Sequence, residues 1–237
     1  MAHGLEAPGT DASPEWESLF RSRGDEVVVH RPVFTGDVFL DVAISGETSP
    51  KSLMVLQHPC AIRIDGVTLT PKLLVAEVNP SSILQPSKWA GGYFKQLPLA
   101  ELRPDHTTKH YAASFDRHHL VTPAELDAAE RIACLSQRGV NLMLQRWVHH
   151  NSRVVVPTYM YQEVSSPQFE EADMIEDWCI DRVEDGIGTF DATDEVDKWL
   201  SLQDDKGITR RARLQDEQER SELRREIRIH LREVRTR

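Results

Sequence analysis

The sequence contains few cysteines and no apolar segment long enough to cross a membrane. Its three cysteines, Cys60, Cys134 and Cys179, are far apart and form no Cys-x-x-Cys pair. This pattern predicts free thiols in a reducing compartment and places the protein in the cytoplasm. No run approaches the roughly 20 apolar residues of a transmembrane helix, so we expect no membrane association. The first 14 residues lack the basic start and apolar stretch of a secretory signal.

The sequence also lacks the motifs of several large enzyme classes. It has no Gly-x-x-x-x-Gly-Lys-Ser/Thr, no Gly-x-Ser-x-Gly and no His-Glu-x-x-His. These absences exclude the common NTPase, α/β-hydrolase and zinc-protease patterns, but not enzymes in general. Two imidazole pairs are present, His118-His119 and His149-His150. Adjacent residues point in different directions, so neither pair chelates a metal readily, and we expect no metal and no cofactor.

Charge is present in quantity but is unevenly distributed. The 237 residues are 40% hydrophobic and 28% charged, with a net charge of −10. Residues 204–237 carry 11 basic and 8 acidic residues, whereas residues 1–203 carry 17 and 30. An acidic body with a basic end predicts an interaction tail. The acidic body repels phosphate at long range, which argues against wrapping of a long nucleic acid.

Short β-type segments separated by turn residues follow a flexible segment at residues 1–25. Asp65-Gly66 is a typical tight-turn dipeptide, and Asn79-Pro80 ends the last segment. This spacing predicts a small antiparallel SH3-like barrel, with a long loop, at residues 26–121. The expected strands are residues 26–30, 38–44, 53–57, 61–64 and 73–78.

The pattern becomes helical at Thr122, where Thr-Pro-Ala-Glu combines a capping box with proline at the first helical position. Residues 122–203 are predicted to be mainly helical, with helical spacing continuing through residues 126–147. Residues 153–160 could form an edge strand, and Ser166-Pro167 is predicted to begin the next helix. With the barrel, this gives an α+β fold.

The stretch Gln57-His58-Pro59-Cys60 places an amide, an imidazole and a thiol at the end of an apolar segment. One interpretation is a thiolate activated by the neighbouring imidazole. A second is a metal site that also recruits His118 and His119. The third, which we favour, is a buried cysteine beside side chains that hydrogen-bond to the backbone, since free cysteine is among the most buried residue types.

Three segments, Arg31–Val42, Leu53–Gln57 and Leu73–Pro80, resemble the first half of the MazF/PemK-type barrel, over about a third of the chain. This resemblance implies an SH3-like barrel and cleavage of single-stranded RNA. The family relies on an arginine and a threonine where this sequence has Lys51 and Asn79, and lysine cannot grip phosphate with a two-pronged guanidinium. The candidate catalytic residues on this interpretation are Lys51, Asn79, His58 and Cys60.

The loop around Trp89 and Tyr93 places aromatic residues beside Lys88 and Lys95. Exposed aromatic rings next to cations are what single-stranded nucleic acid needs for stacking and phosphate contact. We favour the alternative, in which these rings cap the barrel core. Residues 170–185 form a strongly acidic helix, read as a solvated face or a docking surface for a basic partner.

Residues 204–237 are predicted to form an amphipathic helix with two distinct faces. Its apolar edge must be covered either by the protein's own core or by a partner helix. Its arginines form a like-charged stripe that phosphate or an acidic surface would stabilise. The apolar edge consists of Leu223, Ile227, Leu231 and Val234. The arginines are Arg210, Arg211, Arg213, Arg224, Arg228 and Arg232.

The leading hypothesis is a non-catalytic interaction module of a larger assembly. It binds another protein through the C-terminal helix, with RNA or DNA as a further candidate ligand and homo-oligomerisation left open. The barrel resemblance suggests a bacterial phage-defence or toxin–antitoxin context, by analogy. The alternative is a MazF-like endoribonuclease that cuts single-stranded RNA. A weaker alternative is a phage virion or assembly protein.

Overall fold

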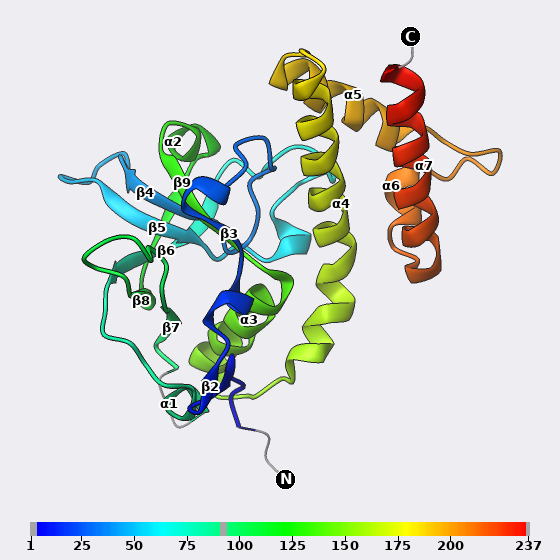
Figure 1. Ribbon diagram of the computed structural model, residues 1–237. Helices are drawn as coiled ribbons and strands as arrows, with labels where there is room; N and C mark the ends of the chain where they lie inside the picture. The colour runs from blue at the N-terminus through cyan, green and yellow to red at the C-terminus, as the bar shows by residue number, and fades with distance from the viewer. Residues whose placement is uncertain (1–3, 91–93, 236–237) are drawn as a thin grey trace. The chain divides into compact units, whose positions relative to one another are not determined.

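The computed structural model describes residues 4–90 and 94–235 (Figure 1). It confirms the α+β class: an antiparallel sheet comes first, and helices follow. The chain divides into two compact units. The sheet unit comprises Met1–Val27 and Phe34–Val164, and the helical unit comprises Val28–Val33 and Ser165–Arg237. None of the helices in the described ranges is long and apolar enough to cross a membrane.

The sheet of the first unit has seven strands within the described residues, and every neighbouring pair is antiparallel. It curls into a half-barrel (Figure 1). The strands, in their order across the sheet, are β3 (Phe20–Arg23), β9 (Glu130–Leu135), β4 (Val38–Val42), β5 (Lys51–Val55), β6 (Leu73–Pro80), β8 (Tyr111–Val121) and β7 (Gln96–Leu99). A separate two-stranded ladder joins β1 (Gly9–Thr10) to β2 (Ser13–Pro14).

The core of the sheet unit lies between the concave sheet and helix α3 (Gln137–Ser152), which packs against β7 and β9. Val38, Leu53 and Val75 from three neighbouring strands are fully buried. The Ser136 hydroxyl caps α3 by accepting a hydrogen bond from a backbone N–H in its first turn. The short helices of this unit are α1 (Pro86–Ala90) and α2 (Pro123–Asp127).

The Gly36-Asp37 pair has a structural role in this core. Gly36 has φ +86° and packs so closely against Leu135 that a Cβ atom would lie 2.8 Å from that side chain. Asp37 is buried, accepts a hydrogen bond from the backbone N–H of Phe34 at 3.0 Å, and pairs with Arg131 at 2.8 Å. These contacts explain why this dipeptide directly precedes β4.

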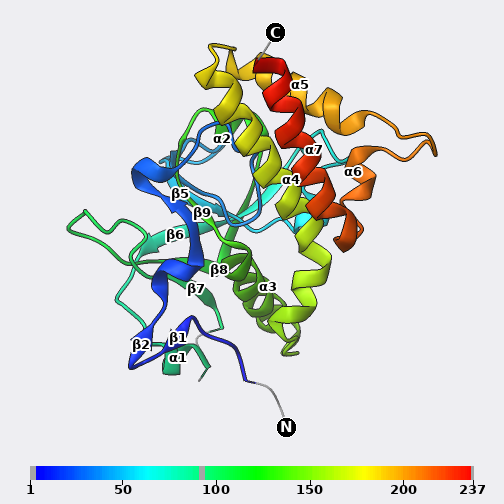
Figure 2. The same cartoon turned by 45° about the vertical axis from the view of Figure 1, so that its right-hand side comes forward.

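The helical unit contains most of α4 (Thr158–Glu184), with α5 (Thr189–Ser201), α6 (Arg210–Arg213) and α7 (Glu217–Arg235). Helix α7 runs alongside α4 in both views (Figure 1, Figure 2). The core of the helical unit includes Trp178, Trp199 and Leu223. Residues 28–33 belong to this unit because Arg31 is buried and pairs with Asp173 and Glu176 of α4, at 2.7 and 2.5 Å.

Several expected elements differ from those observed. The first 25 residues, expected to be flexible, contribute strand β3 and a buried Trp16, because their apolar side chains pack on the sheet. Residues 26–30, expected to be a strand, form none, since residues 28–33 belong to the helical unit and not to the sheet unit. Residues 130–135, expected to be helical, form β9, because pairing with β3 and β4 overrides a helix-like spacing.

The remaining differences concern the start of α4. This helix begins at Thr158, and residues 153–157 are irregular, so the edge strand expected at residues 153–160 does not form. Pro167, expected to begin a helix, lies inside α4. The residues of the expected strand at 61–64 form only one isolated bridge, Arg63 to Leu69, around the Asp65-Gly66 turn. The capping box at Thr122 is confirmed, with both reciprocal hydrogen bonds to Glu125 present.

Candidate ligand-binding hollow on the sheet

A hollow of about 410 Å³ opens in the sheet unit where the start of β5 meets the end of β6. Its lining combines basic, acidic, amide and phenol groups. The side chains that carry this chemistry are Asp41, Lys51, Glu77, Asn79, Arg103 and Tyr111. Pockets with a few convergent polar groups are the usual form of small-ligand sites.

The first structural cause of the hollow is a bulge in β4. Phe39 lies opposite Leu53, and Val42 lies opposite Lys51, so β4 has two residues, 40 and 41, where β5 has only Ser52. Asp41 takes up the extra length with a left-handed backbone, at φ +49°. Bulges and such strained positions cluster at functional sites because they redirect side chains.

A second, larger bulge lies in β8, on the other side of the β5–β6 pair. His118 lies opposite Ala76, whereas Ser114 lies opposite Glu77, so residues 115–117 have no counterpart on β6. The extra residues bend β8 beside Glu77. Both flanking strands are therefore irregular at the level of Glu77.

Glu77 is the centre of an ionic cluster at this point. One of its carboxylate oxygens lies 3.0 Å from His119 Nε2 and 3.7 Å from Lys51 Nζ, and the other lies 3.8 Å from Arg117 Nη1. The hydrogen bond with His119, followed by the charge of Lys51, lowers the pKa of Glu77 below its ordinary value, against the effect of desolvation. Glu77 is therefore ionised at neutral pH.

The cations around Glu77 differ in how accessible they are to a ligand. The side chain of Arg117 is 67% exposed and that of Lys51 is 30% exposed, whereas that of Glu77 is only 12% exposed. Solvent and ligands therefore meet the positive groups before the carboxylate. Arg103 and the Asn79 amide also line the hollow. The hollow therefore suits an anionic ligand with hydrogen-bonding groups.

Of the sequence-predicted catalytic residues, Lys51 and Asn79 line this one hollow. His58 and Cys60 follow the opposite end of β5 and do not line it. His58 Nδ1 accepts a hydrogen bond from the backbone N–H of Cys60, and burial lowers the pKa of this imidazole. Burial also raises the pKa of the Cys60 thiol, so an activated thiolate is not favoured. Cys60 is nevertheless exposed, so the favoured prediction of a buried cysteine is wrong.

The predicted nucleic-acid stacking role of Trp89 is wrong, because its side chain is fully buried. Its ring lies under the guanidinium of Arg146, at 4.4 Å, and its indole N–H donates to the carbonyl of Leu84. Burial lowers the pKa of Arg146 to about 10. Trp89 therefore closes the core, which is the alternative that the sequence favoured. Tyr93 lies outside the described residues.

The basic tail residues mostly pair within the helical unit. Arg211 pairs with Glu171 at 2.7 Å, and Arg224 pairs with Glu170 at 2.6 Å, so the acidic helix and the arginines neutralise each other. Arg210 and Arg213 both pair with Glu226. Charges already satisfied in this way gain little from an added phosphate.

The apolar tail edge is covered mainly by the protein's own core. Leu223, Ile227 and Leu231 are buried in the helical core, and Val234 is half-buried. Of the two alternatives left open by the sequence, the structure therefore shows the internal one. Arg228 and Arg232 are exposed on α7.

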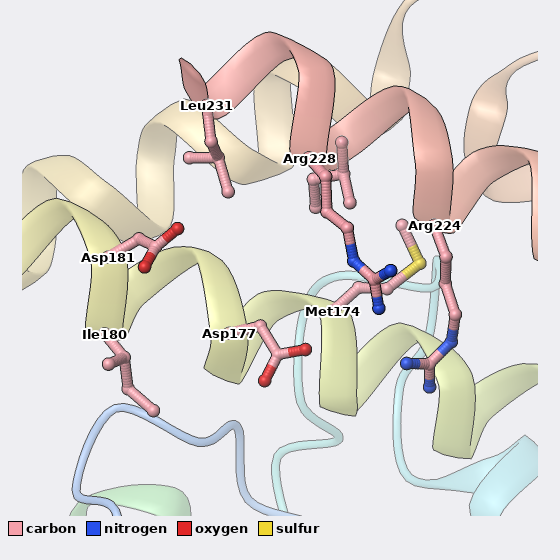
Figure 3. Close-up of a pocket in the computed structure, with 8 residues that line it drawn as sticks. Met174, Asp177, Ile180, Asp181, Arg224, Arg228 and Leu231 are labelled. Atoms are coloured by element: carbon pink, nitrogen blue, oxygen red, sulfur yellow. The ribbon is translucent and has the colours of Figure 1, made fainter. Parts of the chain in front are cut away.

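A hollow also lies in the helical unit, between α4 and α7 (Figure 3). It has a volume of about 250 Å³ and is lined by Arg224 and Arg228 from α7 and by Asp177 and Asp181 from α4.

No group of three or more histidine, cysteine, aspartate or glutamate side chains among the described residues could hold a metal ion.

Sequence reasoning missed Glu77, Arg103, Tyr111, Arg117 and His119. Glu77 occupies an ordinary strand position, and the imidazole pair containing His119 was considered only as a metal ligand. Only the β8 bulge places His119 and Arg117 on the same carboxylate, and bulges leave no reliable signal in a single sequence.

Comparison with models of known protein families finds no match, and comparison with curated proteins also finds no match. The ionic hollow of the sheet unit is therefore the observation from which a function can be argued.

Proposed function

We propose that the protein is a non-catalytic RNA-binding module, in which the hollow of the sheet unit holds a nucleotide of single-stranded RNA. The observation that carries this proposal is the pair of coincident bulges beside the β5–β6 ladder. They surround Glu77 with Lys51, Arg117 and His119 at the edge of a lined hollow.

The phosphate and the base of a nucleotide each have a matching group at this hollow. Lys51, Arg103 and the exposed Arg117 provide positive charge for a phosphate. The Asn79 amide can both donate and accept hydrogen bonds with a base edge. The half-exposed Tyr111 offers a ring on which a base can stack. The volume of about 410 Å³ lies within the usual range for small-ligand sites.

The charge distribution limits how much nucleic acid such a site engages. Residues 1–203 carry 17 basic and 30 acidic residues, so a long duplex is repelled outside the local basic cluster. An unstacked, single-stranded segment places one nucleotide in the hollow without bringing many phosphates against acidic surface. The proposal therefore concerns short single-stranded segments.

A second candidate function is RNA cleavage, which the barrel resemblance also suggests. It rests on the 3.0 Å contact between Glu77 and His119. In such a reaction Glu77 accepts the proton of a 2′-hydroxyl and His119 donates one to the leaving oxygen. The lowered pKa of Glu77 makes it a weak base, which is why we place binding before catalysis.

The test of binding is fluorescence anisotropy with a labelled single-stranded RNA of about 12 nucleotides and a matched DNA duplex. We expect preferential binding of the single strand, weaker at about 200 mM than at about 50 mM salt. Lys51→Ala should lower the affinity about tenfold, the effect of roughly 1.4 kcal/mol. Lys72→Ala, at an exposed lysine outside the hollow, is the matched control. No binding of RNA at low salt overturns the proposal.

The same samples, incubated in EDTA and separated on a denaturing gel, test cleavage. Products that disappear with His119→Ala but persist with His118→Ala would make the second candidate the function. His118 is the matched control because it is adjacent in sequence but lies near Trp147, with ring centroids 6.3 Å apart. Intact RNA with retained binding leaves the non-catalytic role.

A further inference from the structure

The bulge in β4 brings two polar residues to one side of the hollow in the sheet unit. Asp41 takes up the extra length of β4, and Ser52 is the single residue of β5 that lies opposite residues 40 and 41. Both residues line the hollow, and Asp41 is exposed whereas Ser52 is half-buried. The β4–β5 side of the hollow therefore offers a carboxylate and a hydroxyl.

The two carboxylates that line the hollow differ in their partners. Glu77 already has three basic side chains within 4.0 Å. In the part of the chain that the structure describes, Asp41 has neither an ion-pair partner within 4.0 Å nor a side-chain hydrogen bond, and the Ser52 hydroxyl has no hydrogen bond. The Asp41 carboxylate and the Ser52 hydroxyl are therefore available to a ligand, whereas Glu77 is occupied.

A free carboxylate discriminates between the four bases of RNA because it only accepts hydrogen bonds. Guanine alone has two adjacent donors, N1–H and N2–H, on its Watson–Crick edge, with the acceptor O6 beside them. Adenine and cytosine each present one amino group next to an acceptor nitrogen, and uracil presents one N–H between two carbonyl oxygens. Each of these three bases would therefore place an acceptor against a carboxylate oxygen, which is unfavourable.

We propose that the hollow of the sheet unit selects guanine, so that the protein prefers single-stranded RNA in which a guanosine can enter the hollow. This inference rests on the proposed RNA-binding function and adds the identity of the base. The Asp41 carboxylate accepts hydrogen bonds from guanine N1–H and N2–H, and the Ser52 hydroxyl donates to O6. The cations around Glu77 attract the phosphate whatever the base, so Asp41 determines specificity rather than general affinity.

The test is fluorescence anisotropy of the full chain with labelled oligouridines of about 12 nucleotides. Each carries one central guanosine, adenosine, cytidine or inosine, and plain oligouridine is the reference. We expect the guanosine RNA to bind about tenfold more tightly than the adenosine, cytidine and uridine RNAs. Inosine, which lacks only the 2-amino group, should fall between them. Equal binding of all these RNAs overturns the guanine selectivity and leaves the RNA-binding function, whereas no binding of any of them overturns both.

Substitution of Asp41 assigns the selectivity to this carboxylate. Asp41→Asn keeps the shape of the side chain, and asparagine also tolerates the left-handed backbone at φ +49°, so we expect the bulge to persist. The preference for guanosine over adenosine should fall to about threefold or less, because the amide replaces one acceptor by a donor. Asp127→Asn, at an exposed position outside the hollow, is the matched control and should keep the full preference. An unchanged preference in Asp41→Asn overturns the assignment.

Discussion

The two units of this chain are stabilised by different interactions. In the sheet unit, fully buried aliphatic side chains such as Leu53 and Val75 fill the space between the sheet and α3. In the helical unit, a smaller apolar core is surrounded by ion pairs that link α4, α5, α6 and α7. Opposite charges that look in sequence like two separate interaction surfaces can thus be each other's partners.

The difference matters for where a ligand can bind. In the helical unit most of the tail arginines already have carboxylate partners, and a ligand would have to compete with them. In the sheet unit the exposed Arg117 and the partly exposed Lys51 share one carboxylate, Glu77, with His119. Positive charge is therefore less fully compensated at the sheet, although the tail has more arginines.

The largest expected effect comes from the buried ion cluster that joins residues 28–33 to α4. Arg31→Ala removes the cation that pairs with Asp173 and with the buried Glu176. We expect the free energy of unfolding of the helical unit to fall by about 3–5 kcal/mol. Hydrogen exchange of peptides from α4 and α7, followed by mass spectrometry, measures this. Arg225→Ala is the exposed control, and a fall below about 1 kcal/mol would contradict the prediction.

The sheet unit should respond most to a cavity. Leu53→Ala removes a fully buried side chain from β5 and should lower the free energy of unfolding of this unit by about 3 kcal/mol. The loss should be the same at low and high salt, because no charge is involved. Urea titration at two salt concentrations checks it, with Leu120→Ala, which is 57% exposed, as the control. A strong salt dependence would undo the contrast between the units.

A smaller effect is expected at the capping box. Thr122→Ala removes the hydroxyl that accepts from the Glu125 backbone N–H, and should cost about 1 kcal/mol. Amide exchange in α2 is the direct readout. Thr107→Ala, at an exposed position outside this cap, should leave α2 unchanged. Equal exchange in both variants would show that the cap does not stabilise this helix.

The smallest effect is a pH dependence of the helical unit. Hydrogen bonds from Arg182 lower the pKa of Glu195 below its ordinary value of 4.5. Because the folded pKa is depressed, this stability is present above about pH 4.5 and is lost as the pH falls through the folded pKa. The Glu195 side chain is 38% exposed, so we expect less than about 1 kcal/mol.

The acid dependence can be assigned by substitution. Glu195→Gln should flatten the unfolding free energy of the helical unit below about pH 4.5, whereas Glu217→Gln, at an exposed position of α7, should not. Thermal unfolding monitored by circular dichroism over this range provides the measurement. Identical acid profiles for both variants would exclude the Arg182–Glu195 pair as the source.

Much of the local structure could be predicted from the sequence. Short β-type segments separated by turn residues predicted β4, β5 and β6, and the capping box at Thr122 predicted the start of α2. The same reasoning failed for residues 130–135, whose helix-like spacing gives way to pairing with β3 and β4. Strand pairing depends on partners far away in sequence, and such partners leave no local signal.

The candidate site was predictable only in part. Lys51 and Asn79 were reached through the barrel resemblance, and they do line one hollow. His58 and Cys60 were chosen for their chemistry, but they follow the other end of β5. Chemistry-bearing residues are visible in a sequence, whereas which of them share a cavity depends on strand register, which a bulge of one to three residues changes.

The sequence by itself determined the α+β class and the amphipathic nature of the C-terminal helix, because these follow from local periodicity. Only the tertiary structure decided that the C-terminal apolar edge is covered internally and that its arginines face the acidic helix α4. It also decided that two bulges bring Lys51, Arg117 and His119 to Glu77. The physical reason is that burial and charge pairing are satisfied between segments distant in sequence, so a single segment does not reveal its partner.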